Sequence, residues 1–260
     1  MCKAFHKVAD PVTETIALFL ISFIANAFSA FAGGGAGLLQ LPLLIFLGLP
    51  FSVALATHKL ASVALGVGAT VRHFREGTLN WRVSLLILAS GLPGVVLGAL
   101  VIVNIPERPA EFALGILTLG LGLYSIWNKE LGQNIHQPKN NVVHRLVGVG
   151  VLFCIGFLNG SLTSGTGLFV TIWLVRWFGL DYKQAVAYTL VLVGLFWNGT
   201  GAFTLGLQGP IRWDWIPVLF VASALGGYVG AHYAITAGNK WIKRVYEGVT
   251  LLVGVKLLIG

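Results

Sequence analysis

Two short stretches rich in glycine, serine and threonine interrupt long apolar segments of this 260-residue chain. The first is GGGAG at Gly33–Gly37, and the second is SLTSGTG at Ser161–Gly167. Because glycine costs roughly 1 kcal/mol per helical position relative to alanine, both stretches predict a break in a helix. The segment that follows a break starts with N–H groups that lack a carbonyl partner, and its dipole makes that end positive. This chemistry favours the binding of an anion.

The candidate anion site combines the backbone and the hydroxyl groups of both breaks. Glycine lets the backbone approach a ligand closely, and serine and threonine add hydroxyl donors. The alternative is close helix packing through small residues, and packing is the favoured interpretation of Gly94-x-x-x-Gly98 and Gly226-x-x-x-Gly230. From the breaks we take as candidate substrate-binding residues Gly33, Gly34, Gly35, Gly37, Ser161, Thr163, Ser164, Gly165, Thr166 and Gly167.

His58 and Lys59 are further candidates because they lie about eight residues inside an apolar segment. A charge at the centre of a bilayer costs roughly 2.5–3.5 kcal/mol on insertion scales. The acidic residues fall mostly at helix ends or in loops, so we expect an anion to be the partner of Lys59. The alternatives are that Lys59 snorkels to the interface or pairs with carbonyl groups at a helix end. His58 is more typical of a packed or hydrogen-bonding histidine than of a proton relay.

The composition predicts an all-α polytopic membrane protein. The chain is 56% hydrophobic and 10% charged, and its mean hydropathy is +0.84. A helix needs about 20 apolar residues to cross a bilayer. We expect about eight crossings, near Thr15–Ala32, Phe51–Val71, Val83–Val103, Ala110–Trp127, Leu146–Asn159, Ala185–Leu205, Trp215–Ala234 and Val245–Ile259.

The two halves of the chain match each other at an offset of 130 to 132 residues, which predicts a tandem repeat. Gly35 aligns with Gly165 and Trp81 with Trp213, and later glycines follow in the same order. We therefore expect a first membrane repeat at 1–130, a cytoplasmic linker at 131–145 and a second membrane repeat at 146–260. With four crossings in each half, an even number, the repeats would be parallel; a re-entrant hairpin at the glycine segment would change that parity.

Charge and cysteine content exclude other classes. The formal charge of +8 is scattered over short loops, so positive-inside sorting explains it better than nucleic-acid binding. With a cytoplasmic N-terminus, the inner segments would hold nine Lys and Arg residues and the outer segments six. We expect both termini in the cytoplasm. The two cysteines, Cys2 and Cys154, suggest neither a disulfide framework nor a metal site.

The stretch GGGAGLLQLPLLIFLGLP, followed by ALATHKLAS, resembles the TauE/SafE sulfite exporter family, also called the toluenesulfonate uptake permease family. The resemblance covers nearly the whole chain. In the family's ATNKL-type stretch, His58 stands at the Asn position and Lys59 keeps the Lys. The second half has TSGTG at Thr163–Gly167 and AVAYTLVLVGLFWN at Ala185–Asn198, where Leu190 replaces an expected lysine. Thr189, in that run, completes the candidate set.

The resemblance implies a protein of the bacterial inner membrane that moves sulfur-containing anions such as sulfite, sulfonates, sulfoacetate or thiosulfate. We expect a secondary transporter, working as an exporter, and no enzyme. An anion channel is the alternative, and an intramembrane serine hydrolase is disfavoured because no pattern ties a histidine to Ser164. No cofactor, metal or nucleotide-binding loop is expected. The expected partners are a small anionic substrate, the lipid bilayer and, in a homodimer, a second copy of this chain.

Overall fold

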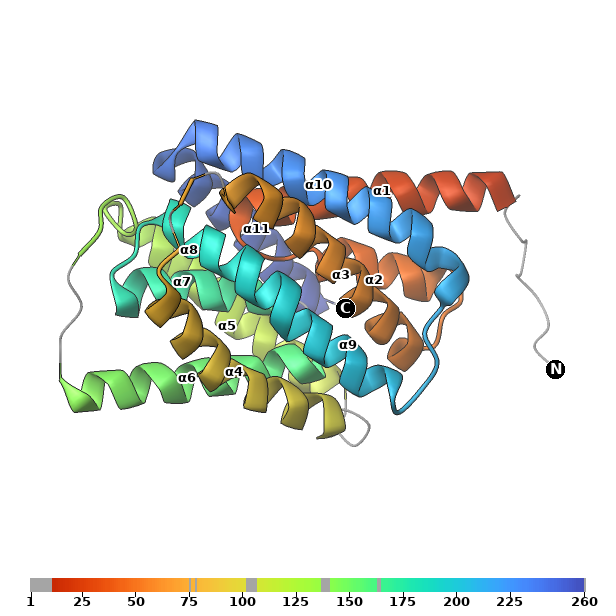
Figure 1. The fold of residues 1–260 in the computed structure, drawn as a ribbon, viewed down its shortest axis with the longest axis horizontal. Helices are drawn as coiled ribbons and strands as arrows, with labels where there is room; N and C mark the ends of the chain where they lie inside the picture. The colour runs from red at the N-terminus through yellow and green to blue at the C-terminus, as the bar shows by residue number, and fades with distance from the viewer. Residues whose placement is uncertain are drawn as a thin grey trace.

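The computed structural model describes residues 11–74, 76–77, 79–101, 107–136, 141–162 and 165–259. These residues fold into helices joined by short turns, with no strand among them (Figure 1). The prediction of an all-α protein is therefore confirmed. The elements are α1 (Pro11–Ala32), α2 (Gly37–Phe46), α3 (Phe51–Phe74), α4 (Trp81–Val101), α5 (Glu107–Trp127), α6 (Val142–Ser161), α7 (Thr166–Phe178), α8 (Tyr182–Tyr188), the π-helix η2 (Thr189–Trp197), α9 (Asn198–Gly206), the 3₁₀ turn η3 (Trp213–Trp215), α10 (Ile216–Ala237) and α11 (Asn239–Ile259).

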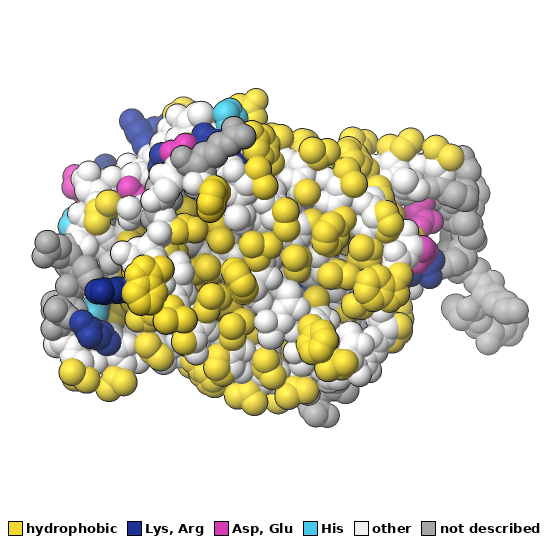
Figure 2. Space-filling view, viewed as in Figure 1, with side chains coloured by type: hydrophobic (Ala, Val, Ile, Leu, Met, Phe, Trp, Pro, Cys, Tyr) yellow, Lys and Arg dark blue, Asp and Glu magenta, His cyan; other side chains and the backbone are white. Residues whose placement is uncertain are grey.

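Apolar side chains cover much of the surface seen in Figure 2, as expected for helices that face lipid. Six helical segments of the described chain are long and apolar enough to cross a bilayer. This number is smaller than the eight that we expected, because α5 and α11 are not among them. The six are Val12–Ala32, Phe51–Phe74, Trp81–Val101, Val142–Ser161, Tyr182–Gly206 and Trp213–Ala237.

The turns gather at two ends of the molecule. The segment between α5 and α6 marks one end, which we call the linker end; it lies at the left in Figure 1. Hydrogen bonds tie this segment to other turns: Tyr182 N to Gly132 O (2.9 Å), His136 N to Gly179 O (2.7 Å) and Asn239 Nδ2 to Gln133 O (3.1 Å). The opposite end is joined in the same manner: Arg212 N to Thr57 Oγ1 (3.0 Å), Gln208 Nε2 to Ala99 O (3.0 Å) and Arg108 Nη2 to Leu258 O (3.1 Å).

Helices α1 and α6 enter the molecule from opposite ends. Helix α1 packs in parallel along α10, which runs from the opposite end to the linker end, whereas α6 starts directly after the linker (Figure 1). Each then reverses at a glycine break, so α2 returns to the opposite end and α7 returns to the linker end. The pairs α1–α2 and α6–α7 are thus two hairpins.

This arrangement corrects the expected parity. We expected four crossings in each half and parallel repeats, but α1–α2 and α6–α7 each leave at the end where they enter. Three helices of each half then run between the ends: α3, α4 and α5, and afterwards α8–η2–α9, α10 and α11. The start of α1 and the linker therefore lie at opposite ends of the molecule, whereas eight crossings would place them at the same end.

The paired glycines of α4 and α10 serve close helix packing, as predicted. A Cβ atom built on Gly94 would lie 2.2 Å from the carbonyl oxygen of Phe153 in α6. On Gly226, it would lie 2.5 Å from the carbonyl oxygen of Phe23 in α1. Each hairpin is therefore held by a helix of the other half, since only glycine permits these backbones to approach so closely.

Candidate functional site

The chain leaves the helical conformation at both predicted breaks. Helix α1 ends at Ala32, and Gly33, Gly34 and Gly35 follow with φ angles of 83°, 150° and 103°. Helix α6 ends at Ser161, and Gly165 precedes α7 with a φ of 75°. Residues with a Cβ atom rarely adopt such angles. The composition of the two stretches thus accounts for both breaks.

The two breaks lie in contact with each other. The hydroxyl of Thr171 in α7 donates a hydrogen bond to Gly33 O at 2.9 Å. A Cβ atom on Gly34 would lie 2.6 Å from the backbone nitrogen of Leu168. The breaks of two hairpins that enter from opposite ends therefore meet inside the molecule, with no room for a side chain between them.

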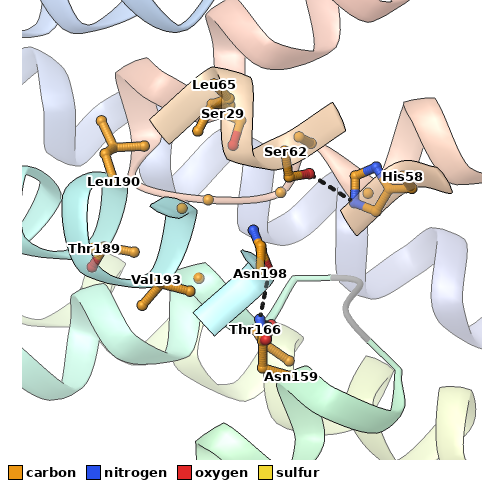
Figure 3. A pocket seen from close by; sticks show the side chains of 16 residues that line it. Ser29, His58, Ser62, Leu65, Asn159, Thr166, Thr189, Leu190, Val193 and Asn198 are labelled. Carbon is orange, nitrogen blue, oxygen red and sulfur yellow. Dashed lines mark hydrogen bonds between the residues drawn. The ribbon is translucent and has the colours of Figure 1, made fainter. Parts of the chain in front are cut away.

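A cavity of about 50 Å³ lies where the breaks meet (Figure 3). In Figure 3, His58 and Ser62 of α3 lie on one side of it, and Asn159, Thr166 and Asn198 lie on the other. The lining residues come from both hairpins, from α3 and from the rod α8–η2–α9: Ser29, Gly34, Gly35, Ala36, Gly37, His58, Ser62, Leu65, Asn159, Thr166, Gly167, Thr189, Leu190, Val193, Gly194 and Asn198.

The residues at the start of α2 form one wall of the cavity. Gly35, Ala36 and Gly37 line it and precede the first hydrogen bonds of α2, in which Leu39 N and Gln40 N donate to Ala36 O. The first N–H groups of a helix have no acceptor within that helix. This wall therefore favours the binding of an anion, because the positive end of the α2 dipole also lies there.

His58 connects the cavity to a buried polar cluster. Its Nδ1 lies 2.8 Å from Gln40 Oε1, and the Gln40 amide donates to Ser22 Oγ at 3.0 Å. On the cavity side, Nε2 of His58 lies 3.4 Å from Ser62 Oγ. Since the amide nitrogen of Gln40 donates to Ser22, its oxygen faces His58 and accepts a hydrogen bond there, so Nδ1 of His58 carries the proton. The cavity therefore faces the other ring nitrogen, Nε2.

Lys59 is completely buried but does not line the cavity. Its ammonium donates to the backbone oxygen of Asn159 at 2.6 Å and to Asn159 Oδ1 at 3.3 Å. Asn159 O belongs to the last turn of α6, where carbonyl groups lack helical partners and cations are favourable. The Asn159 amide in turn donates to Thr166 Oγ1 at 2.9 Å. Lys59 thus makes the pairing with a carbonyl group at a helix end that the sequence analysis gave as one alternative.

The structure brings together part of the predicted set. Seven of the thirteen candidates line the cavity: Gly34, Gly35, Gly37, His58, Thr166, Gly167 and Thr189. Four lie outside the lining: Gly33, Lys59, Ser161 and Gly165. Ser161 is satisfied by its own helix, because its hydroxyl donates to Phe157 O at 3.0 Å. Thr163 and Ser164 lie outside the described residues.

Sequence reasoning missed four polar residues of the lining: Ser29, Ser62, Asn159 and Asn198. A signal existed for Asn159, because it stands two residues before the second break. The described residues contain no group of three or more His, Cys, Asp or Glu residues that could hold a metal ion. The polar groups of the lining are amides, hydroxyls and one imidazole, which together can hydrogen-bond a small anion.

The chain is similar to a known protein family over nearly its full length. Residues 18–257 match the model of the family described as sulfite exporter TauE/SafE. A "Probable membrane transporter protein" of Haemophilus influenzae is 30% identical over 242 residues, with 93% of each chain covered. "Probable membrane transporter protein ORF9" of a Sinorhizobium species is 30% identical, with 98% of this chain and 94% of the relative covered.

A third relative is "Probable membrane transporter protein YfcA" of Escherichia coli K12, which is 28% identical over 242 residues. No solved structure matches the chain significantly. The family match spans both helix breaks and every residue that lines the cavity. The chain is thus a multi-pass membrane protein that belongs to the TauE/SafE sulfite exporter family.

Proposed function

We propose that this chain is a secondary transporter, not an enzyme, and that it exports a small sulfur-containing anion from the cell. The observation that carries the proposal is the meeting of two helix breaks around a polar cavity. Broken helices whose N-termini face a central site are typical of transporters that bind anionic groups. The family match and the relatives named membrane transporters support the same conclusion.

The size of the cavity favours a small inorganic anion. A water molecule needs roughly 10–15 Å³ of a cavity in this measure, so a cavity of about 50 Å³ holds an ion of a few heavy atoms. Sulfite and thiosulfate are of this size. Sulfoacetate and larger sulfonates would require the hairpins to move apart.

The proposed ligand contacts combine both halves of the chain. The amides of Gly35 and Gly37 and the hydroxyl of Thr166 are the proposed direct contacts, because these residues line the cavity, whereas the hydroxyl of Thr189 is already hydrogen-bonded to that of Thr171 at 3.0 Å. Lys59 acts through Asn159, because it holds the Asn159 side chain and stabilises the end of α6. Lys59 is thus a positioning residue that also supplies positive charge close to the site.

We infer that the two halves form inverted repeats around this site. The first repeat comprises α1 to α5, the second comprises α6 to α11, and the linker joins them between Trp127 and Val142. The helix order of the halves, the reversal at each glycine break and the reciprocal packing of α4 on α6 and α10 on α1 support this inference. Alternating access would then arise from movement of one hairpin against the other.

The linker end is proposed to face the cytoplasm of a bacterial inner membrane. Among the described Lys and Arg residues other than Lys59, nine lie at this end: Arg72, Arg82, Lys129, Arg145, Arg176, Lys183, Lys240, Lys243 and Arg244. Three lie at the opposite end: Arg108, Arg212 and Lys256. This bias follows the positive-inside rule. The start of α1 and the end of α11 then face the exterior.

A thermal-stability screen of the purified protein tests the proposal. Sulfite, thiosulfate, sulfoacetate, taurine, sulfate and chloride are added at equal ionic strength, since a ligand that binds only the folded state raises its stability. At 100 times its Kd, such a ligand adds about 2.7 kcal/mol. We expect sulfite or thiosulfate to stabilise more than taurine. Failure of every anion would contradict the proposed function.

Counterflow in proteoliposomes separates a transporter from a channel. A transporter loaded with unlabelled anion on one side accelerates the entry of labelled anion from the other side, and the rate saturates. A channel shows neither property.

A further inference from the structure

The linker end contains a second cavity that the transport site does not use. It has a volume of about 790 Å³ and lies between the end of α5, the linker, the start of α6 and the end of α7. It is therefore separate in position and far larger than the cavity at the helix breaks. Most of its side chains are basic or aromatic, and Glu130 is the acidic member among the described lining residues.

Arg176 presents a fixed guanidinium group to this cavity. Its Nε donates to the hydroxyl of Tyr124 at 2.6 Å, which orients the group. The described residues place no carboxylate within ion-pair distance of Arg176. The two terminal nitrogens remain available as a planar pair of donors, the geometry that matches phosphate oxygens.

A rigid aromatic pair forms one wall. The rings of His144 and Trp177 stack at 4.3 Å with an angle of 4° between their planes. His144 Nε2 donates to Trp177 O at 3.0 Å, and Trp177 Nε1 donates to His144 O at 3.0 Å. These two hydrogen bonds fix the start of α6 against the end of α7, so the wall is already in place before a ligand binds.

Apolar side chains continue from the mouth of the cavity along the outer surface. Trp127 at the end of α5 is 79% exposed, and Val142, Val143 and Leu146 on the first turns of α6 are 72%, 68% and 66% exposed. Figure 2 shows basic and histidine side chains gathered beside apolar surface at the linker end. A ligand that fits this arrangement carries a phosphate and also long apolar chains.

We propose that this cavity binds the phosphate headgroup of an anionic phospholipid from the leaflet at the linker end. Arg176 is the main contact and Lys129 the second, and together they exceed the charge of Glu130. The acyl chains lie along the apolar surface of α6. Basic pockets between membrane helices are known to hold anionic headgroups in this manner.

Lipid titration of the purified full chain in detergent tests the proposal. The affinity for phosphatidylglycerol is measured by native mass spectrometry, with phosphatidylcholine and inorganic phosphate as separate arms. Arg176→Gln is compared with Arg244→Gln. Arg244 is another exposed arginine at the same end, and it stacks on Trp241 at 5.0 Å outside the cavity. We expect Arg176→Gln to weaken phosphatidylglycerol binding about tenfold or more, and Arg244→Gln less than twofold.

Lys129→Gln is a second test variant in case the Arg176 variant folds poorly. Lys129 lies in an exposed turn, so its replacement should not disturb folding. It should weaken binding in the same direction. Equal losses in the Arg176 and Arg244 variants would overturn the proposal, since general attraction to the charged end would then explain the binding. Inorganic phosphate that binds as tightly as phosphatidylglycerol would overturn it as well. The anion screen at the helix breaks is independent of these outcomes.

Discussion

Lys59 shows how one residue can supply charge to a site that it does not touch. Its ammonium is held by two oxygens of Asn159, and Asn159 is the residue that reaches the cavity. Removal of the ammonium takes a charged donor away from the carbonyl group of Asn159 at the end of α6 and from its side-chain oxygen, so the Asn159 side chain is held less firmly, with its hydrogen bond to Thr166 left in place. Both effects act on the anion through Asn159.

We therefore expect Lys59→Met to lower both thermal stability and anion affinity. A charge-assisted contact is worth about 1.5–3 kcal/mol, which sets an upper limit of roughly 10- to 150-fold on the loss of affinity, because Lys59 acts on the anion only through Asn159. The measurement is the binding constant of the best ligand from the anion screen, at one ionic strength. Wild-type affinity in this variant would show that the positive charge of Lys59 has no part in binding.

A double-mutant cycle separates an indirect role of Lys59 from a direct one. If Lys59 acts through the Asn159 side chain, then Lys59→Met should weaken binding little further in an Asn159→Ala background. Additive losses would place the ammonium in direct contact with the anion. The sequence could locate Lys59 in an apolar helix, but its partner is a backbone oxygen 100 residues away, which no local pattern encodes.

At the scale of elements, the two breaks were predictable and their surroundings were not. Consecutive glycines predict a break in the helix, and the positive φ angles of Gly33 and Gly35 confirm this break. Whether α1 crosses the bilayer was not predictable, because this mostly apolar helix of 22 residues has the length of a full crossing. Length and hydropathy alone do not distinguish a helix that crosses from one that turns back at a break.

Gly34→Ala tests whether contact between the breaks is essential. The new Cβ would lie 2.6 Å from Leu168 N, and it would also be strained at the φ of 150°. We expect a marked loss of anion binding. The control is Gly150→Ala on α6, where nothing lies within 4 Å of the new atom. This change should be neutral or stabilise by up to about 1 kcal/mol, and a harmless Gly34→Ala would contradict the site.

We expect Gly94→Ala to lower the thermal stability of the protein, although it adds only one methyl group. Its Cβ would lie 2.2 Å from the carbonyl oxygen of Phe153, so α4 and α6 would have to separate. Overpacking of this kind costs typically about 1–3 kcal/mol. A thermal-unfolding comparison with Gly120→Ala, which meets nothing within 4 Å, should show a lower Tm for the Gly94 variant alone.

An ion pair joins the end of α3 to the start of α8 at the linker end. Glu76 bonds Arg72 at 2.9 Å and Lys183 at 3.1 Å, and these hydrogen bonds hold the pKa of the Glu76 carboxyl below its ordinary value. A lowered pKa contributes stability at neutral pH that is lost as the pH falls through the folded-state value. The Tm difference between wild type and Glu76→Gln should therefore shrink below about pH 4. A difference that is constant with pH would contradict this role.

At the scale of the whole molecule, the all-α membrane class could be read from the sequence, whereas the end of the molecule at which each cation lies could not. A re-entrant hairpin changes the parity of all later segments, so one misassigned hairpin moves several charges to the wrong side. Eight crossings would place Arg176, Lys183, Lys240, Lys243 and Arg244 on the side opposite to the linker, whereas the structure places them at the linker end.

Topology reporters test this arrangement directly. Since nine described cations lie at the linker end and three at the opposite end, we expect the linker in the cytoplasm and the end of α11 outside. Alkaline phosphatase, which is active only outside the cytoplasm, should be active when fused after α11. Single cysteines placed at Asn134 and at Gln208 in a cysteine-free background provide the control in the unfused chain. A membrane-impermeant maleimide added to intact cells, whose outer membrane has been permeabilised, should label position 208 and leave position 134 unlabelled. Labelling of both positions from one side would contradict the hairpins, because an odd number of crossings must separate the linker from the turn between α9 and α10.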